Sequence, residues 1–476
     1  MQVKEINQGE RDAGRSDSRY GHRHAVLLIV LVAVFMAVID GTVVNIALPT
    51  MTRSFAVDLE NTQWTVTAYL ITMTSLLLVF GKVSEYIGRA RLFFVGIIIF
   101  TASSLACGLA TTLSGLIFFR VLQGAGAAML FSISSALIFE TAPHAEQGRS
   151  MGYLGSTVAI GSIAGPVVGG LIVDTLGWQY CFFINIPIGI LLVIAAVRYL
   201  RFEKTSSAPF SLDLPGAAMM TSAFVFLILG LGNLAADTEI TPVTILFFCA
   251  CVLLFFFFVL HERRCAAPLL DLSIFSVSRF SLPLIGLLFV FIANFIMIVV
   301  GPFYFEGVLD YRPAQVGLAF LISPALIMIV APISGTLFDR YRTRYLATAG
   351  VCVVAFAFAL LSIFTLDWNV TGILCAFVLA GIGNGFFQSP NNTAIMSALP
   401  REKIDIASSV TATARNLGMA LGVSFGSILL SVQFLQAGYF GDVLHVAPSL
   451  LATSTSHIMI VCCLLCGVVA LISLRR

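Results

Sequence analysis

Residues 35–49 read FMAVIDGTVVNIALP, and a single acid stands in the middle of this otherwise uncharged stretch. Between Ala25 and Leu48 the only charged side chain is that of Asp40. The stretch is long enough to cross a lipid bilayer, for which about 20 residues suffice. A carboxylate at that depth costs roughly 2.5–3.5 kcal/mol on insertion scales. We therefore expect a polar partner elsewhere in the chain to offset this cost.

The composition indicates a membrane protein. Of the 476 residues, 59% are hydrophobic and 11% are charged, whereas soluble domains carry about 25% charged residues. The net charge of +2 is too small to indicate nucleic-acid binding. The Asp40 segment is too long for the apolar core of a cleaved signal peptide. The ten cysteines lie mostly within apolar runs, which favours packing residues over disulfides or metal ligands.

Apolar runs between charged or Pro- and Gly-containing breaks predict an all-α protein with fourteen transmembrane helices. These spans lie near residues 25–48, 62–80, 92–111, 113–138, 150–173, 179–199, 215–234, 241–260, 280–305, 314–338, 345–366, 370–397, 405–432 and 453–474. If the N-terminus is cytoplasmic, twenty-two of the 26 Lys and Arg residues fall on the cytoplasmic side. The positive-inside rule therefore predicts that both termini are cytoplasmic.

An internal repeat divides the chain. GKVSEYIGRAR at 81–91 is echoed by GTLFDRYRTRY at 335–345, an offset longer than six spans and a loop by about the length of two helices. Duplicated halves are typical of secondary transporters, with the substrate site at their interface. We predict a cytoplasmic tail at 1–24, a six-helix bundle at 25–204, a two-helix insert at 205–265 and a second six-helix bundle at 266–476.

A second charge lies within the membrane at a depth similar to that of Asp40. Asp40 lies roughly 13 Å from Pro49 at the outer end of its span, and Arg120 roughly 10 Å from the outer end of the fourth span, at 1.5 Å per residue. We expect the two to share a polar site, directly or through Gln123. Asp40 can then alternate between charged and protonated forms, as proton exchange requires. The alternative is a static ion pair. Arg415 in the thirteenth span is expected to be buried by the same logic.

Four motifs resemble those of the major facilitator superfamily, and the chain is most similar to its fourteen-helix drug:proton antiporters. The motifs are DGTVVNIALP at 40–49, RVLQGAGAA at 120–128, the antiporter motif GSIAGPVVGG at 161–170, and the loop at 81–91. The loop departs from the family pattern, because Glu85 replaces the usual Asp and Tyr86 stands where a basic residue is common. The resemblance covers nearly the whole chain from about Ala25.

The resemblance implies a multi-pass protein of the plasma membrane with the major facilitator fold. It implies export of small organic or drug-like compounds, often cationic and amphipathic, in exchange for protons. The partners would be the bilayer, the substrates and protons, with the proton gradient in place of any cofactor, and the chain would act as a monomer. Alternatives are a dedicated metabolite exporter or a symporter of the same fold. A polytopic membrane enzyme or sensor is a further alternative, but it would need a catalytic cluster.

The loops after the second and tenth spans are expected to form a conformational latch between the halves. Gly81 and Gly88 would permit a tight turn, while Glu85 and Arg89 would bridge neighbouring helix ends. The alternative is that these charges only set the topology. The predicted latch comprises Gly81, Glu85, Gly88, Arg89, Gly335, Asp339 and Arg340.

Three glycines of the fifth span, Gly161, Gly165 and Gly169, recur every four residues and therefore share one helix face. Small residues let helix backbones approach closely, so close packing explains the pattern by itself. The resemblance adds an antiporter meaning and includes Pro166 and Gly170 in the motif.

Several other polar and aromatic residues are candidates for a substrate cavity. These are Asn45, Trp64, Tyr69 and Tyr304. Glu306, near the outer surface, is expected either to attract cationic substrates or to be a solvated interfacial charge.

Two short patterns that resemble enzyme motifs are rejected. HERRC at 261–265 begins like the zinc-protease HExxH but ends in Cys265. GVSFG at 422–426 matches GxSxG, yet it lies inside a helix rather than at a strand-to-helix elbow. The chain also has no GxxxxGK[ST] sequence, which argues against ATP hydrolysis. The sequence therefore predicts neither an enzyme active site nor a metal site.

Overall fold

A computed structural model describes residues 22–57, 59–200, 202, 212–237, 241–265, 268–343, 345–439 and 446–474. Most of the predicted cytoplasmic tail and most of the loop at 200–215 lie outside the described residues. The boundaries predicted for the tail, the halves and the insert therefore stay a prediction.

The described chain is helical along nearly its whole length. Its first part comprises α2 (Arg23–Phe55), α3 (Leu59–Ile87), α4 (Arg89–Gly108), α5 (Leu113–Thr141), α6 (Gln147–Thr175), α7 (Tyr180–Phe183) and α8 (Asn185–Tyr199). Two further helices follow, α9 (Leu214–Asp237) and α10 (Pro242–Glu262). The last part comprises η1 (Leu272–Ser276), α11 (Ser278–Gly307), α12 (Pro313–Tyr341), α13 (Tyr345–Leu366), α14 (Val370–Ser397), η2 (Arg401–Lys403), α15 (Ile404–Gln436) and α16 (Pro448–Leu474).

Local sequence explains where several helices begin and end. The hydroxyls of Thr112 and Thr241 accept a backbone hydrogen bond at the starts of α5 and α10, as N-cap residues do. Gly88, with φ of 92°, makes the turn between α3 and α4, in a region that residues with a Cβ rarely adopt. Pro187 has no N–H to bond back to Phe183, and the sixth span is accordingly split there into α7 and α8.

The helices confirm the predicted fold. Among the described residues, thirteen helices are long and apolar enough to cross a membrane. The glycine-rich α6 is a fourteenth long helix and packs between α2 and α12. Each of the fourteen predicted spans thus corresponds to one helix or, for the sixth, to the α7–α8 pair.

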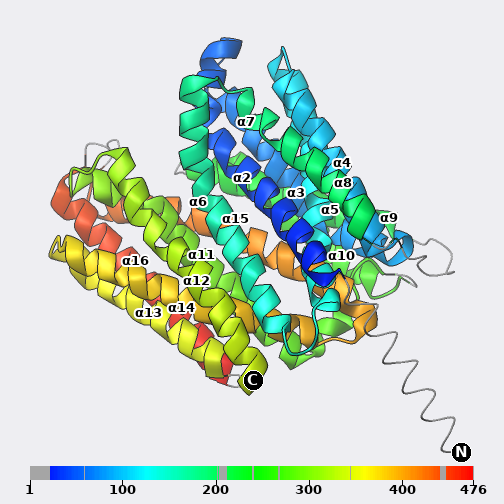
Figure 1. The fold of residues 1–476 in the computed structure, drawn as a ribbon. Helices are drawn as coiled ribbons and strands as arrows, with labels where there is room; N and C mark the ends of the chain where they lie inside the picture. The colour runs from blue at the N-terminus through cyan, green and yellow to red at the C-terminus, as the bar shows by residue number, and fades with distance from the viewer. Residues whose placement is uncertain are drawn as a thin grey trace, which may run out of the picture.

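The helices form two halves that meet through α6 and α15. Figure 1 shows α11–α14 and α16 on one side and α2–α5 on the other, with α6 and α15 between them. Helix α6 packs on α2 of its own half and on α12 of the other. Helix α15 packs on α11 of its own half and on α3 and α5 of the other. These two helices therefore carry much of the contact between the halves.

One end of the molecule, here called the basic end, carries Arg89 at the start of α4, Arg149 in the first turn of α6 and Arg342 just after α12. Helix α2 begins near this end, where Arg23 lies 3.6 Å from Glu146. Helix α16 finishes at the same end as α2 begins (Figure 1). The two ends of the described chain thus lie on one side of the molecule, as an even number of spans requires.

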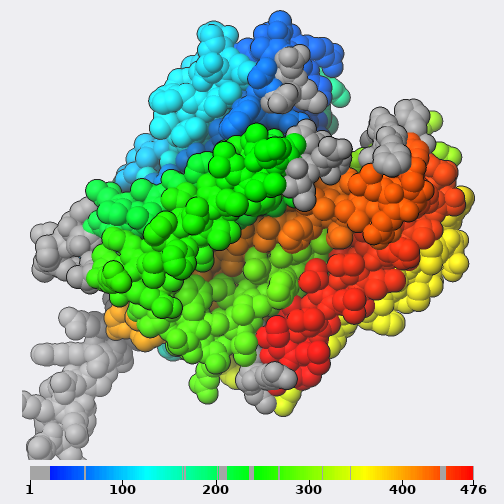
Figure 2. Space-filling view, turned by 180° about the vertical axis from the view of Figure 1, so that it is seen from behind, coloured from blue at the N-terminus to red at the C-terminus, as the bar shows by residue number. Residues whose placement is uncertain are grey.

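The inserted helices α9 and α10 lie at the periphery. Figure 2 shows them, in green, crossing between the N-terminal and C-terminal helices on one face of the molecule. Helix α10 exposes many large apolar side chains, including Leu246, Val252, Phe256 and Phe257. Helix α9 packs against α3 and α15. An apolar cavity of about 370 Å³ lies between the insert and α3, α11 and α15.

Candidate functional site

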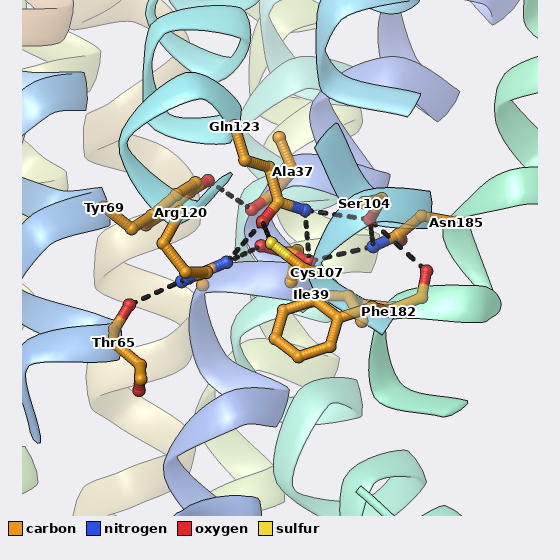
Figure 3. Close-up of polar contacts among 12 residues, drawn as sticks. Ala37, Ile39, Thr65, Tyr69, Ser104, Cys107, Arg120, Gln123, Phe182 and Asn185 are labelled. Atoms are coloured by element: carbon orange, nitrogen blue, oxygen red, sulfur yellow. Dashed lines mark hydrogen bonds and ion pairs between the residues drawn. The ribbon is translucent and has the colours of Figure 1, made fainter. Parts of the chain in front are cut away.

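Asp40 is fully buried in α2, and three side chains from α5 and α8 donate hydrogen bonds to its carboxylate. Figure 3 labels these donors, Arg120, Gln123 and Asn185. Its Oδ2 accepts from Nη1 of Arg120 at 2.5 Å. Its Oδ1 accepts from Nε2 of Gln123 and from Nδ2 of Asn185, each at 2.8 Å. The ion pair expected from the similar depths of Asp40 and Arg120 is thus present, and it is direct.

The Arg120 guanidinium is held from several sides. Its Nε donates to the backbone oxygen of Thr65 at 2.8 Å, and its Nη1 also donates to Oε1 of Gln123 at 2.7 Å. Its Cζ lies 4.1 Å from the centre of the Tyr69 ring, a favourable position for a cation. Its Nη2 is buried and has no hydrogen-bond partner in the described chain. Removal of a partner from such a buried group is costly.

A serine on α4 completes the network. Ser104 Oγ accepts from both Gln123 Nε2 and Asn185 Nδ2 at 2.9 Å, and it donates to the backbone oxygen of Phe182 at 3.3 Å. Each amide nitrogen therefore uses both of its hydrogens, one on Asp40 and one on Ser104. Sequence reasoning missed Asn185 and Ser104. The signal for Asn185 was available, because it is a lone amide in an apolar span.

This arrangement suits a group that gains and loses a proton. Asp40, Arg120, Gln123, Asn185 and Ser104 are each at most 1% exposed, so a single carboxylate and a single guanidinium offset each other away from water. Protonation of Asp40 would remove the negative charge that Arg120 faces. The position of Arg120 and the charge of Asp40 are thereby linked, and all five residues lie in the first half of the chain.

At the basic end, Arg89 joins three helices. From the start of α4 its Nη1 contacts Oε2 of Glu140 on α5 at 2.5 Å, and its Nε donates to Oδ1 of Asp405 on α15. Arg89 therefore bridges both halves, and its role in a conformational latch stays a prediction. Glu85 does not, because its carboxylate pairs with Lys82 of the same helix at 2.7 Å.

Asp339 of α12 provides a second bridge between the halves. Its two carboxylate oxygens accept from the backbone N–H groups of Gly148 and Arg149 at 2.8 and 3.0 Å. These groups lie in the first turn of α6, where the helix dipole favours an anion. Ser389 of α14 adds a hydrogen bond to the Gly148 oxygen at 2.6 Å. The neighbouring Arg340 forms no ion pair in the described chain, and its guanidinium lies 5.6 Å from the Tyr341 ring.

Two glycines of the predicted latch lie where two helices come into close contact, not in turns. Gly81 lies within α3, so the predicted turn at this position is wrong. A Cβ there would lie 2.5 Å from the Cβ of Ser409 on α15. A Cβ on Gly335 of α12 would lie 2.2 Å from the backbone oxygen of Gly148 on α6. Both glycines let the two halves touch at the basic end.

The glycine motif of α6 packs against α2 of the same half. A Cβ on Gly165 would lie 1.8 Å from Oγ1 of Thr42. Cβ atoms on Gly161 and Gly169 would approach Val38 and Val43 to 2.9 and 2.7 Å. The shared face predicted from the spacing is therefore the α2 contact.

Gly170 is not part of that contact. A Cβ on Gly170 would meet no atom within 4 Å, so its inclusion in the packing motif is wrong. Gly170 follows Gly169 directly and so points about 100° away around the helix. The side chain of Pro166 lies outside the described residues.

The cavity candidates divide into two groups. Asn45 and Trp64 are exposed. Tyr69 and Tyr304 are buried, and their hydroxyls donate to backbone oxygens of Ala37 and Thr365 within their own halves. Neither tyrosine presents a free hydroxyl to a substrate in this conformation.

The remaining charged candidates, Glu306 and Arg415, have no carboxylate or cation partner in the described chain. Glu306 is exposed at the end of α11 and forms no ion pair. Arg415 is only 7% exposed, and its Cζ lies 5.9 Å from the centre of the Phe291 ring. Arg415 is thus buried as predicted, but unlike Arg120 it is not neutralised by an acid.

Comparison with known proteins places these observations in context. A family model described as Major Facilitator Superfamily matches residues 30–423. Riboflavin transporter RibZ of Clostridioides difficile (strain 630) is 30% identical over 433 residues, which cover 91% of this chain and 93% of RibZ. Multidrug resistance protein Stp of Mycobacterium tuberculosis (strain CDC 1551 / Oshkosh) is 31% identical, over 84% of this chain and 76% of Stp. Puromycin resistance protein pur8 of Streptomyces alboniger is 33% identical, over 84% and 80%.

Solved structures share the fold. The human organic anion transporter MFSD10 (TETRAN) aligns with a TM-score of 0.60 at 13% identity, over 93% of this chain and 99% of that chain. The proton:xylose symporter XylE aligns with a TM-score of 0.60 at 13% identity, over 94% and 95%.

Proposed function

The chain belongs to the major facilitator superfamily, and from that premise we propose that it exports small organic compounds from the cell in exchange for protons. In this proposal it is a transporter of the plasma membrane with both termini in the cytoplasm. The basic end is then the cytoplasmic end, in agreement with the positive-inside rule. The names of relatives such as Stp and pur8, which refer to drug resistance, support an exported cargo.

The observation that carries the proton coupling is the sealed contact between Asp40 and Arg120. A buried carboxylate whose neighbours all donate to it is stable as an anion only while they stay in place. A movement of α5 relative to α2 would weaken the pair and favour uptake of a proton. Restoration of the contact would expel that proton. One residue pair can thus link proton movement to helix movement.

The contacts at the basic end support alternating access. Arg89 with Asp405, and Asp339 with the first turn of α6, join the halves at that end. In the proposed orientation this conformation is closed toward the cytoplasm. Export requires these contacts to break so that cargo enters between the halves from the cytoplasm, and to re-form before the cargo leaves outside.

A second candidate is a dedicated exporter of one metabolite that is not a cation. The name of RibZ, a riboflavin transporter, shows that a similar chain is named for a single compound. The specific observation in its favour is Arg415, a buried guanidinium that pairs with no acid within the described part of the chain. An anionic or carbonyl group on a cargo would offset the desolvation of this guanidinium.

The test is transport by the purified full chain in proteoliposomes with an imposed pH gradient. A panel of compounds is first screened in cells that lack their own efflux pumps, with and without a protonophore. With a transported compound in hand, Asp40→Asn should abolish uphill, proton-driven transport and preserve downhill exchange of the compound. Folding should survive, because a neutral amide is cheaper in the membrane than a carboxylate.

The matched control is Asp174→Asn, which alters an exposed aspartate near the end of α6. This variant should transport as the parent does. Normal proton-driven transport by Asp40→Asn would refute the coupling role and leave Asp40 as a structural ion pair. If the parent protein transports the compound at the same rate with and without a pH gradient, proton exchange is refuted.

A further inference from the structure

A cluster of titratable side chains lies at the basic end of the two-helix insert, apart from the Asp40 network. Asp213 immediately precedes α9, His261 lies in the last turn of α10, and Cys265 follows α10 by three residues. His261 and Cys265 are four residues apart, so they lie on the same side of the chain where α10 ends. The cluster thus combines the residue before α9 with residues at and just after the end of α10.

The ligand-bearing atoms of this cluster converge. Nε2 of His261 lies 2.8 Å from Oδ1 of Asp213. One ligand atom each from Asp213, His261 and Cys265 lie within 4.8 Å of one another. Tetrahedral ligands about 2.0–2.3 Å from a zinc ion are separated by somewhat less than this. Small side-chain rotations would therefore bring all three to one ion.

Two buried carboxylate oxygens beside the cluster have no hydrogen-bond partner among the residues that the structure describes. They are Oδ2 of Asp213 and Oε1 of Glu262, in residues that are 7% and 5% exposed. A Cβ on Gly216 would lie 2.3 Å from the first of these oxygens and 2.9 Å from the second. The two oxygens therefore face the same small region above the Gly216 backbone, where a glycine leaves room.

Among the described residues, His261 is the base that pairs with these acids, through Oδ1 of Asp213, while Oδ2 of Asp213 and Oε1 of Glu262 have no hydrogen-bond donor. Arg263 and Arg264 are exposed, and neither forms an ion pair with the two acids in the described chain. The other Asp213 oxygen is already used, because it accepts from the Gly216 N–H at 2.9 Å. Buried carboxylates without partners are costly unless they are protonated, paired or bound to a metal.

We propose that Asp213, His261 and Cys265 bind a divalent transition-metal ion, zinc, at this end of the insert. A thiolate with an imidazole selects zinc over magnesium or calcium, which prefer oxygen ligands alone. The carboxylate of Asp213 supplies the third ligand. Glu262 adds negative charge beside the site, and water completes the tetrahedron.

The bound ion has a structural consequence. It would link the residue before α9 to the end of α10 and so hold these two helices together at the basic end. Oε2 of Glu262 also accepts from the backbone N–H of Leu270 at 3.4 Å, and Leu270 leads toward η1 and α11. The site would therefore fix the insert to the start of the second half. The rejection of HERRC as a protease motif is unaffected.

The experiment measures zinc binding by the full chain in detergent after removal of any affinity tag. The protein is incubated with zinc chloride, dialysed and analysed for bound metal by elemental mass spectrometry. We expect about one zinc ion per chain, and a higher thermal unfolding temperature in zinc than in chelator. Cobalt chloride should give a thiolate-to-cobalt charge-transfer band.

Two variants locate the site. Cys265→Ser should lose the stoichiometric zinc and the charge-transfer band. Asp213→Asn should lose zinc but keep its helix-capping role, because Asn caps a helix as well as Asp does. The control is Cys249→Ser, which removes an exposed thiol of α10 away from the cluster and should bind zinc as the parent does.

Either of two results would overturn the site. The parent chain binds no zinc, in which case the two acids are instead stabilised by a shared proton. Alternatively, both variants bind zinc as the parent does, which would place the metal elsewhere. If Asp213→Asn fails to fold, the half-exposed Cys265 and the cobalt spectrum still decide the question.

Discussion

At the scale of single residues, the position of Asp40 in an apolar helix is explained by its donors. Asp40 is on α2, and three other helices supply the polar network around it: Ser104 is on α4, Arg120 and Gln123 are on α5, and Asn185 is on α8. Each charge is buried with its counter-charge, so the attraction between the two offsets part of the desolvation cost of each. This balance makes the pair sensitive to the loss of one partner.

Arg120→Ala should destabilise the protein by about 3–5 kcal/mol, because it leaves a buried carboxylate without its cation. The double variant Asp40→Asn/Arg120→Ala should be more stable than Arg120→Ala alone. Thermal unfolding of the purified proteins in detergent, followed by tryptophan fluorescence, measures both effects. Equal stability of the single and double variants would show that Asp40 and Arg120 do not depend on each other.

The sequence predicted one part of this network and missed another. Arg120 was found because a charged residue inside an apolar span is conspicuous and its depth can be counted. Asn185 and Ser104 were missed because an amide or a hydroxyl in an apolar run has many possible partners, and helical rotation is not legible from spacing alone. The unpaired state of Arg415 was missed for the same reason, since depth does not identify neighbours.

At the scale of elements, α6 changes partners along its length. Near the basic end, its Gly148 and Gly152 contact Gly335 and Ala331 of α12 in the other half. Farther along, its glycine motif contacts α2 in its own half. In the alternating-access cycle that we propose, the first contact breaks, whereas the second holds α6 within its bundle. A small residue at each crossing lets the backbones approach.

Gly165→Ala should destabilise the first half and reduce transport, because the added Cβ would overlap Thr42, with 1.8 Å between Cβ and Oγ1. Gly170→Ala on the same helix has open space around its Cβ and serves as the control, with transport unchanged. Transport rates in proteoliposomes and melting temperatures distinguish the two. Equal losses in both variants would point to glycine flexibility rather than to close packing.

The turn predicted at Gly81 shows where glycine patterns mislead. Gly81 and Gly88 flank the same basic loop, and either can make a turn. Only Gly88 has a positive φ, while Gly81 lies within α3 and contacts α15. A glycine that serves a long-range contact cannot be told from a turn glycine in a single sequence, because the contacting residue lies hundreds of positions away.

At the scale of the whole molecule, the contacts that join the halves gather at the basic end. Arg89 with Asp405, Asp339 with the first turn of α6, and the Gly81 and Gly335 crossings all lie there. Away from this end, the glycine motif of α6 packs against α2 of its own half. The two bundles are therefore fastened at one end, as a transporter closed on that side requires.

Asp405→Asn should weaken the closed conformation, because hydrogen bonds to charged groups contribute about 1.5–3 kcal/mol. The ratio of open to closed protein at the basic end should rise roughly tenfold or more. Spin labels at the exposed positions Arg91 and Glu402, one in each half, report the distance across this end. Labelling uses a background without exposed native cysteines.

The control for this experiment is Lys82→Gln. It breaks the Lys82–Glu85 ion pair, which lies within α3 and joins no two helices. Its distance distribution should match that of the parent. A shift of equal size in both variants would mean that the loss of any ion pair near this end, rather than of the bridge between the halves, opens the closed state.

The fourteen spans and the two-helix insert could be predicted from the sequence. Membrane helices need long apolar runs, and the basic residues cluster in every second loop between these runs. The Asp213, His261 and Cys265 cluster could not be predicted. Its members are far apart in sequence at the two ends of a helical pair, and HERRC was compared only with an enzyme motif. Long-range convergence of this kind depends on how α9 and α10 pack.

The confinement of the Asp40 network to the first half has an evolutionary consequence. If energy coupling resides in one bundle, substitutions in the other bundle can alter which compound is carried without retuning the proton site. Such a chain can acquire a new cargo in single mutational steps, each of which leaves a working pump. Gene duplication followed by drift in the second half would then diversify substrates rapidly, while the ion pair between Asp40 and Arg120 stays under constant selection.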